Sequence, residues 1–234
     1  MISAFILGAC ICIGLVALGY QLSESIVYVK SLERTIVVKG LSEREVRADI
    51  AIWPITFSEA GNDLAQLFSD IQQKNDQIFD FLTGQGFNKE EISVSAPGIL
   101  DKQAQGYGGS EKLKFRYSGS STITVYTGNV DHVRTAMREL VKLGKAGIAI
   151  SGQNYQTQTE FLFTKLNEIK PQMIEEATKN ARKVAEKFAK DSRSKLGKIK
   201  KATQGQFSIS NRDSNTPYIK KVRVVSTIEY LLSD

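Results

Sequence analysis

The residue types that most often carry out chemistry are few in this chain and widely spaced. His132 is the only histidine, and it follows Asp131 at the expected start of a helix. A zinc site needs more nitrogen or sulfur ligands than this, and a catalytic triad needs a nucleophile held against the ring. Asp80, Glu90 and Glu91 fall at expected helix ends or in loops, and no spacing places two of them in one cleft. We therefore expect an exposed His132 and predict no catalytic residue, no metal site and no cofactor.

Two other segments have residue types that can bind anions. Gly106, Gly108 and Gly109 resemble a phosphate-binding loop, but the following Lys112 does not fit the GxxxxGK[ST] spacing and no helical pattern follows. This segment is better explained as the tip of a hairpin. The stretch 195–201 (KLGKIKK) is the best candidate for anion contact, yet it lacks the interleaved aromatic residues that single-strand binders use for stacking. We expect no nucleic-acid partner.

Composition predicts a folded body that needs no disulfide. The chain has 234 residues, 41% of them apolar, which is enough to bury a substantial core. Its net charge of +6 is modest for this size. Both cysteines, Cys10 and Cys12, lie in the apolar N-terminal stretch, so the rest of the chain has no thiol and is compatible with either side of a membrane.

The N-terminal stretch is apolar and long enough to cross a bilayer. No charged residue occurs from Ile2 to Leu18, and a helix extended to Tyr20 would be close to the roughly 30 Å of a hydrocarbon core. We predict that residues 1–22 form a transmembrane anchor and that 23–33 form a juxtamembrane linker. The anchor residues are Ile2, Phe5, Ile6, Leu7, Ile11, Ile13, Leu15, Val16 and Leu18.

Two processing events compete with retention of this anchor. Signal cleavage would follow the small residues Ala17 and Gly19, and lipidation would modify Cys10. Retention is favoured because the chain lacks a basic segment before the apolar run, and because a lipidation site at Cys10 would leave almost no hydrophobic region before it. The flanking charges nearly cancel, so the positive-inside rule does not fix the orientation.

The soluble part, residues 34–234, shows periodicities of both strands and helices. Strands are predicted at 35–39, 45–57, 92–99, 114–126, 147–151, 155–164, 198–209 and 220–232. Helices are predicted at 62–85, from Asn129 to Gly144, and at 169–192. The order of strand, helix, strand and returning strand occurs twice. This predicts an α+β fold made of a duplicated unit that shares one antiparallel-rich sheet packed by long helices.

Two features within these elements predict how they pack. Trp53 lies on a strand that is apolar on both faces, so it is expected inside the sheet or at a subunit contact, and the adjacent Pro54 predicts a bulge or an edge. The last helix carries small residues four apart, which would let it approach a sheet or another helix closely. These residues are Ala177, Ala181, Ala185 and Ala189.

The order of several short patterns resembles the SIMPL domain family of YggE-type envelope proteins. The resemblance is carried by 35–40 (TIVVKG), the strand 45–57, the strand 121–127 and the alanine-rich helix running into 196–199 (LGKI), and it covers residues 34–232. It implies an α+β domain exported to the periplasm of Gram-negative bacteria, without established catalytic residues. It also implies assembly into homo-oligomeric rings or cages and a link to protection against oxidative stress.

The hypothesis that follows is a non-catalytic, self-assembling scaffold. It would be anchored in the bacterial inner membrane by a single pass, with lipid around its N-terminal helix and its C-terminal domain in the periplasm. The alternative is a periplasmic adaptor that binds an envelope protein through its basic helix face or through its loop tips, at Tyr107, Asn211, Arg212 and Asp213. An unrecognised hydrolase is the third hypothesis.

Overall fold

The computed structural model describes residues 2–32, 34–104, 114–152 and 158–233. Within the first helix, side chains are described at position 8 and from 11 to 26. The architecture is mixed α+β with antiparallel sheets, as predicted. The chain forms two compact units: unit 1 contains Met1–Arg44, Asn167–Ile209 and Lys221–Asp234, and unit 2 contains Glu45–Leu166 and Ser210–Lys220.

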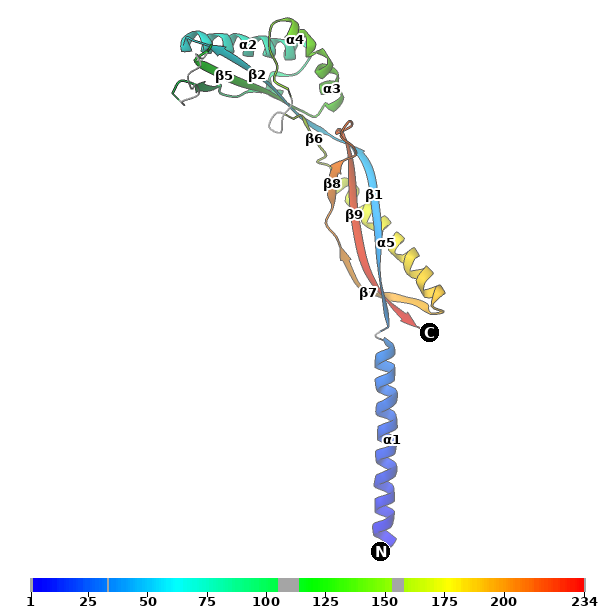
Figure 1. The fold of residues 1–234 in the computed structure, drawn as a ribbon. Coiled ribbons are helices and arrows are strands. Elements are labelled where there is room, and N and C mark those ends of the chain that lie inside the picture. The colour runs from blue at the N-terminus through cyan, green and yellow to red at the C-terminus, as the bar shows by residue number, and fades with distance from the viewer. Residues whose placement is uncertain (1, 33, 105–113, 153–157, 234) are drawn as a thin grey trace. The chain divides into compact units, whose positions relative to one another are not determined.

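A long helix, α1 (Ile2–Leu32), opens the chain (Figure 1). The apolar stretch predicted as an anchor is therefore helical. The helix also runs through most of 23–33, where the sequence predicted a linker. No glycine or proline occurs from Tyr20 to Leu32, so nothing in the sequence stops the helix where the apolar stretch ends.

Unit 1 is built on a four-stranded sheet, sheet A, with α5 lying along it (Figure 1). The strand order is β1-β9-β7, and β8 also pairs with β9. One side chain in two along β9 is buried, because α5 covers only one face of the sheet. The elements are β1 (Thr35–Arg47), α5 (Leu166–Asp191), β7 (Lys195–Gln204), β8 (Ser208–Asn211) and β9 (Ile219–Ser233).

The alanine row of α5 is what allows this close packing. All four alanines are buried, and Ala181 and Ala185 share a core with Val38, Ile228 and Tyr230 of the sheet. The close approach also needs Gly40 on β1, where an added Cβ would lie 1.8 Å from the carbonyl oxygen of Ala177. The row lies against the sheet of its own unit.

Unit 2 holds a five-stranded sheet, sheet B, with α2 packed against its central strands (Figure 1). The order is β3-β5-β2-β6, β4 also pairs with β5, and all of these pairings are antiparallel. The elements are β2 (Ile50–Gly61), α2 (Leu64–Gly84), η1 (Lys89–Glu91), β3 (Ile92–Val94), β4 (Gly98–Asp101), β5 (Tyr117–Thr127), α3 (Val130–Glu139), α4 (Val141–Lys145) and β6 (Glu160–Leu162).

The two sheets share one strand order. In unit 1 the elements β1, α5, β7, β8 and β9 follow one another along the chain, and β9 lies between β1 on one side and β7 on the other. In unit 2 the elements β2, α2, β3, β4 and β5 do the same, with β5 between β2 and β3. The strand β1 therefore corresponds to β2, α5 to α2, and β9 to β5. Among the described strands, sheet B alone has a further strand, β6, on the outer side of β2.

The prediction of one shared sheet is wrong. The strands form two sheets, and the repeated order uses different elements from those predicted. The reason is that the larger segment of unit 2, Glu45–Leu166, separates β1 from the rest of unit 1, so the first strand of unit 1 is far in sequence from its partners. Local periodicity does not indicate which of two distant strands pair with each other.

Trp53 and Pro54 are both explained by the position of β2. Trp53 is 2% exposed, so it lies inside the core of unit 2 rather than at a subunit contact, and its ring is 6.3 Å from that of Phe87. On the outer side of β2, β6 pairs only with 50–52, and the next hydrogen bond is donated by the Ser151 N–H to the Thr56 carbonyl. Pro54 directs its backbone nitrogen to the same side as Thr56, where no described residue pairs with it. Among the described residues, β2 is therefore locally an edge at Pro54, one of the two predicted alternatives.

Two local predictions need correction. The helix predicted at 62–85, with Asn62 as its cap, begins at Leu64, and its cap is Asp63, whose carboxylate accepts a hydrogen bond from the Gln66 N–H. The side-chain oxygen of Asn62 instead accepts a hydrogen bond from the Arg116 N–H at 2.9 Å. The strand predicted at 147–151 is reduced to an isolated bridge between Phe57 and Ile150.

Candidate functional site

The outer edge of β1 is one of the two edges of sheet A, and the direction of its backbone groups follows from its pairing with β9. At its start, the Arg34 carbonyl accepts from the Leu232 N–H at 2.8 Å, so Arg34 faces β9. Backbone groups alternate in direction along a strand, so the odd-numbered residues direct theirs away from β9. Leu41 agrees with this, because its carbonyl accepts from the side chain of Asn180 on α5 at 2.8 Å.

The same odd-numbered residues carry exposed side chains. Val37 is 61% exposed and Leu41 is 41% exposed, on the face of sheet A that α5 does not cover. Asn180 occupies the edge at Leu41, so the accessible part runs from Thr35 to Lys39. No strand among the described residues pairs with this edge. In sheet B the corresponding edge, that of β2, is covered by β6.

The opposite edge of sheet A is formed by β7, which differs in composition. Almost every residue of β7 is exposed, including Ile199 and the lysines at 198 and 201. The Lys200 ammonium lies 3.4 Å from the Glu229 carboxylate of β9. Sheet A therefore has two dissimilar edges, one with the apolar Val37 and one rich in lysine.

The C-terminal loop tip is held in a fixed shape by Asp213. Its carboxylate accepts from the hydroxyl and the N–H of Thr216, from the Asn215 N–H and from the Arg212 guanidinium. These donors, the Thr216 hydroxyl above all, lower the pKa of Asp213 to about 2. Arg212 also reaches Glu45 at 3.4 Å. Asn211 accepts from the ammonium of the buried Lys220. Of the residues predicted for the two tips, these three lie together, and Tyr107 lies outside the described residues.

His132 is half-buried, which corrects the expected exposed position. Its ring packs edge-on against Phe87, with 4.5 Å between ring centroids, and its Nε2 is buried without a hydrogen-bond partner among the described atoms. Glu91 accepts from the Thr127 hydroxyl and from the Asn88 N–H, and these hydrogen bonds together with His132 lower the pKa of Glu91. Within the described residues, no group of three or more potential ligands is placed to hold a metal ion.

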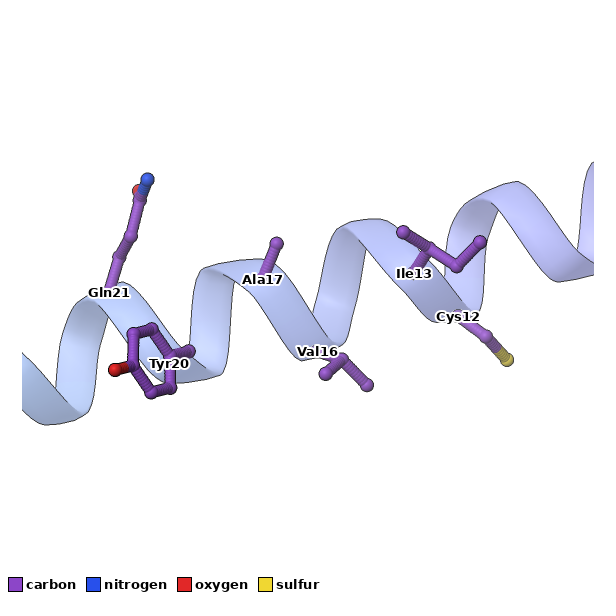
Figure 2. Close-up of a pocket in the computed structure, with 6 residues that line it drawn as sticks. All are labelled: Cys12, Ile13, Val16, Ala17, Tyr20 and Gln21. Carbon is purple, nitrogen blue, oxygen red and sulfur yellow. The ribbon is translucent and has the colours of Figure 1, made fainter.

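The described part of α1 presents large apolar side chains to its surroundings. Ile13, Leu15, Val16 and Leu18 are each more than half exposed. A hollow on this helix is lined by two neighbouring rows, Cys12, Val16 and Tyr20 beside Ile13, Ala17 and Gln21 (Figure 2). A single helix supplies all six residues, so the hollow is the space between side chains on a helix surface rather than a binding cavity.

The proposed anchor can be compared only in part with this helix. The side chains of Ile2, Phe5, Ile6 and Leu7 lie outside the described residues, whereas those of Ile11 to Leu18 lie within them. In the described part of the chain, no helix is both long enough and apolar enough to cross a membrane.

Sequence patterns did not identify the β1 edge. The run Ile36-Val37-Val38 is apolar without alternation, so it does not show which side chain faces the core. One signal was present. On a strand, Ile36 and Val38 share one face, so Val37 lies on the opposite face with the polar residues Thr35 and Lys39. The uncovered edge of β1 becomes visible only when the two sheets are compared.

The comparisons with known proteins agree with the resemblance described above. The SIMPL family, described as "Protein of unknown function (DUF541)", matches residues 36–227. No curated protein matches the chain. The match begins in β1, ends in β9 and includes both units. Because it covers most of the chain, this protein belongs to the SIMPL family.

Proposed function

We propose that this protein is a non-catalytic scaffold of the bacterial envelope, anchored in the inner membrane by α1, that assembles with copies of itself through sheet A in the periplasm. The observation that carries this proposal is the open edge of β1. Its counterpart β2 is covered by β6 in the same chain, whereas β1 has no such cover among the described strands. An extended strand added there would form backbone hydrogen bonds that the isolated chain leaves to water.

The two dissimilar edges of sheet A suit head-to-tail assembly. Pairing of two β1 edges around a two-fold axis would end at a dimer, whereas pairing of β1 with β7 of the next copy leaves a new edge at each step. Such pairing closes into a ring when the rotation between copies permits.

The membrane anchor is supported by the composition and exposure of α1. A helix in water normally buries an apolar stripe, but α1 is uncharged from Ile2 to Gln21 and its described apolar side chains are exposed on all sides. A lipid environment would cover this surface. The tether would also hold copies in one plane and raise their effective concentration, so that a weak edge contact suffices for assembly.

Replacing Val37 by proline tests the edge directly. The N–H of Val37 points away from β9, so Val37→Pro removes one outward donor without removing a hydrogen bond of sheet A. We expect the assembled species in detergent to dissociate at about tenfold higher concentration or more, as follows from one or more lost backbone hydrogen bonds. Light scattering of the full chain measures this.

Val37→Thr is the matched control, because threonine is β-branched and keeps the N–H. It should assemble like the unmodified protein. Circular dichroism of both variants checks that sheet A is intact. If Val37→Pro is folded and keeps the unmodified assembly, the β1 edge is not the contact.

A further inference from the structure

One end of unit 1 carries more positive charge than the entire chain. The residues from Arg182 to Lys201 include nine lysines and arginines against two acids, Glu186 and Asp191, a net charge of +7, whereas the whole chain carries +6. No aspartate or glutamate occurs from Ser192 to Ile209. We call residues 182–201 the basic end. They include the last turns of α5, the turn after it and the start of β7.

The basic end also exposes large apolar side chains. Phe188 is 56% exposed, more than Phe68 or Phe115, and it lies with Val184 in a hollow of about 380 Å³. Lys183 and Lys187 line the same hollow. Alanines take the core-facing positions of α5, so Phe188 contributes nothing to the core of unit 1. An exposed aromatic residue between lysines is typical of surfaces that enter a lipid headgroup layer.

Chain connectivity keeps the basic end close to α1. Arg34 lies two positions after Leu32, the last residue of α1, a reach of about 7 Å. The Arg34 carbonyl accepts from the Leu232 N–H, and Leu232 pairs with Leu196 on β7. Two strand spacings, about 10 Å, therefore separate Arg34 from the basic end. Figure 1 shows the last turn of α5 and the start of β7 beside the C-terminal end of β9.

The length of α1 sets the height of this end above a bilayer. The helix has 31 residues and a length of about 46 Å, and a bilayer with its headgroups is about 40–45 Å thick. When α1 spans the membrane, its C-terminal end thus emerges at the headgroup boundary. The basic end then lies within about one or two Debye lengths of the lipid phosphates.

We propose that the basic end binds the anionic headgroups of the same membrane that holds α1, an inference that rests on the proposed anchoring. The lysines would lie against lipid phosphates, and Phe188 and Val184 would enter the layer between them. Because the tether makes this contact intramolecular, a few lysines and one aromatic residue are enough to populate it. The contact would fix the orientation of unit 1 on the membrane and so present its two strand edges to neighbouring copies.

Phe188→Trp in the full chain provides the probe. Trp53 is the only native tryptophan and is buried in unit 2, so it adds a constant background. The variant is reconstituted into nanodiscs of phosphatidylcholine alone, or of phosphatidylcholine with phosphatidylglycerol, each containing brominated lipid. We expect quenching of the introduced tryptophan to be about threefold stronger with phosphatidylglycerol and to fall in about 1 M salt, where the Debye length is about 3 Å.

Two further variants serve as controls. Phe68→Trp places the probe on α2 of unit 2, where Phe68 is 45% exposed, and its quenching should not depend on lipid charge. Adding Lys183→Glu and Lys187→Glu to Phe188→Trp should abolish the effect of phosphatidylglycerol.

The possible results separate the anchor from the headgroup contact. Elution of the chain apart from the discs contradicts the anchor and this inference together. Retention in the discs with equal quenching in both lipid compositions leaves the anchor intact and overturns the headgroup contact. Fluorescence of the Phe188→Trp variant that responds to single-stranded DNA but not to phosphatidylglycerol also overturns it, since the basic end would then be a nucleic-acid surface.

Discussion

Replacing Gly40 by alanine should open unit 1 by separating α5 from sheet A. The added Cβ would lie 1.8 Å from the Ala177 carbonyl oxygen and 2.5 Å from the Ala181 nitrogen, both of them backbone atoms of a packed helix. No rotamer change relieves such an overlap, so the helix must move. We expect a loss of about 3 kcal/mol in the free energy of unfolding of unit 1, the upper end of the usual cost of overpacking. Hydrogen exchange of the α5 amides in the full chain measures this loss.

Gly84→Ala is the control for this substitution. Gly84 is the last residue of α2, and an added Cβ meets no atom within 4 Å. Alanine favours the helix by about 1 kcal/mol at interior positions, so protection of unit 2 should stay the same or rise. Unchanged protection of α5 in Gly40→Ala would show that the helix does not pack on β1 as described.

Replacing Trp53 by alanine should have the largest effect in unit 2. The side chain is 2% exposed, its strand position pairs with Val125, and it packs near Phe87 in the core. Large-to-small changes of this kind cost about 3–5 kcal/mol, because transfer energy is lost and a cavity remains. Urea unfolding followed by circular dichroism tests this, since the variant has no tryptophan to observe.

Tyr126→Ala provides the matched comparison on the adjacent strand. Tyr126 is 55% exposed, on the face of sheet B opposite the core. Its replacement should change the unfolding free energy by less than about 1 kcal/mol, the usual range of a cross-strand contact. Similar losses in Trp53→Ala and Tyr126→Ala would contradict the assignment of Trp53 to the core.

Local patterns were sufficient for the helices and for the hairpin of unit 2. The three- and four-residue spacing of six apolar residues predicted the core-facing side of α2: Leu64, Leu67, Phe68, Ile71, Ile78 and Leu82. Leu67, Ile71, Ile78 and Leu82 are buried, whereas Leu64 and Phe68 in the first turns are exposed. The alanine spacing predicted the packing face of α5. These predictions succeed because helical periodicity is set by neighbours within a few residues.

The assignment of strands to sheets could not be predicted in this way. β1 pairs with β9, which lies at the other end of the chain, and the sequence of β1 does not indicate which strand it pairs with. Asn62 and Asp63 are both good helix caps, and only the contact of Asn62 with Arg116 decides between them. Likewise, the exposed fraction of Val37 depends on which face of sheet A is covered by α5.

The mass of the full-length protein, extracted from membranes in mild detergent at its native concentration, tests the central claim most directly. The chain has a mass of 25.9 kDa. Assembly through both edges of sheet A predicts a membrane-extracted species of defined mass larger than a dimer. A single species of 25.9 kDa, or recovery of the protein in the soluble fraction without detergent, would contradict the anchored, self-assembling scaffold.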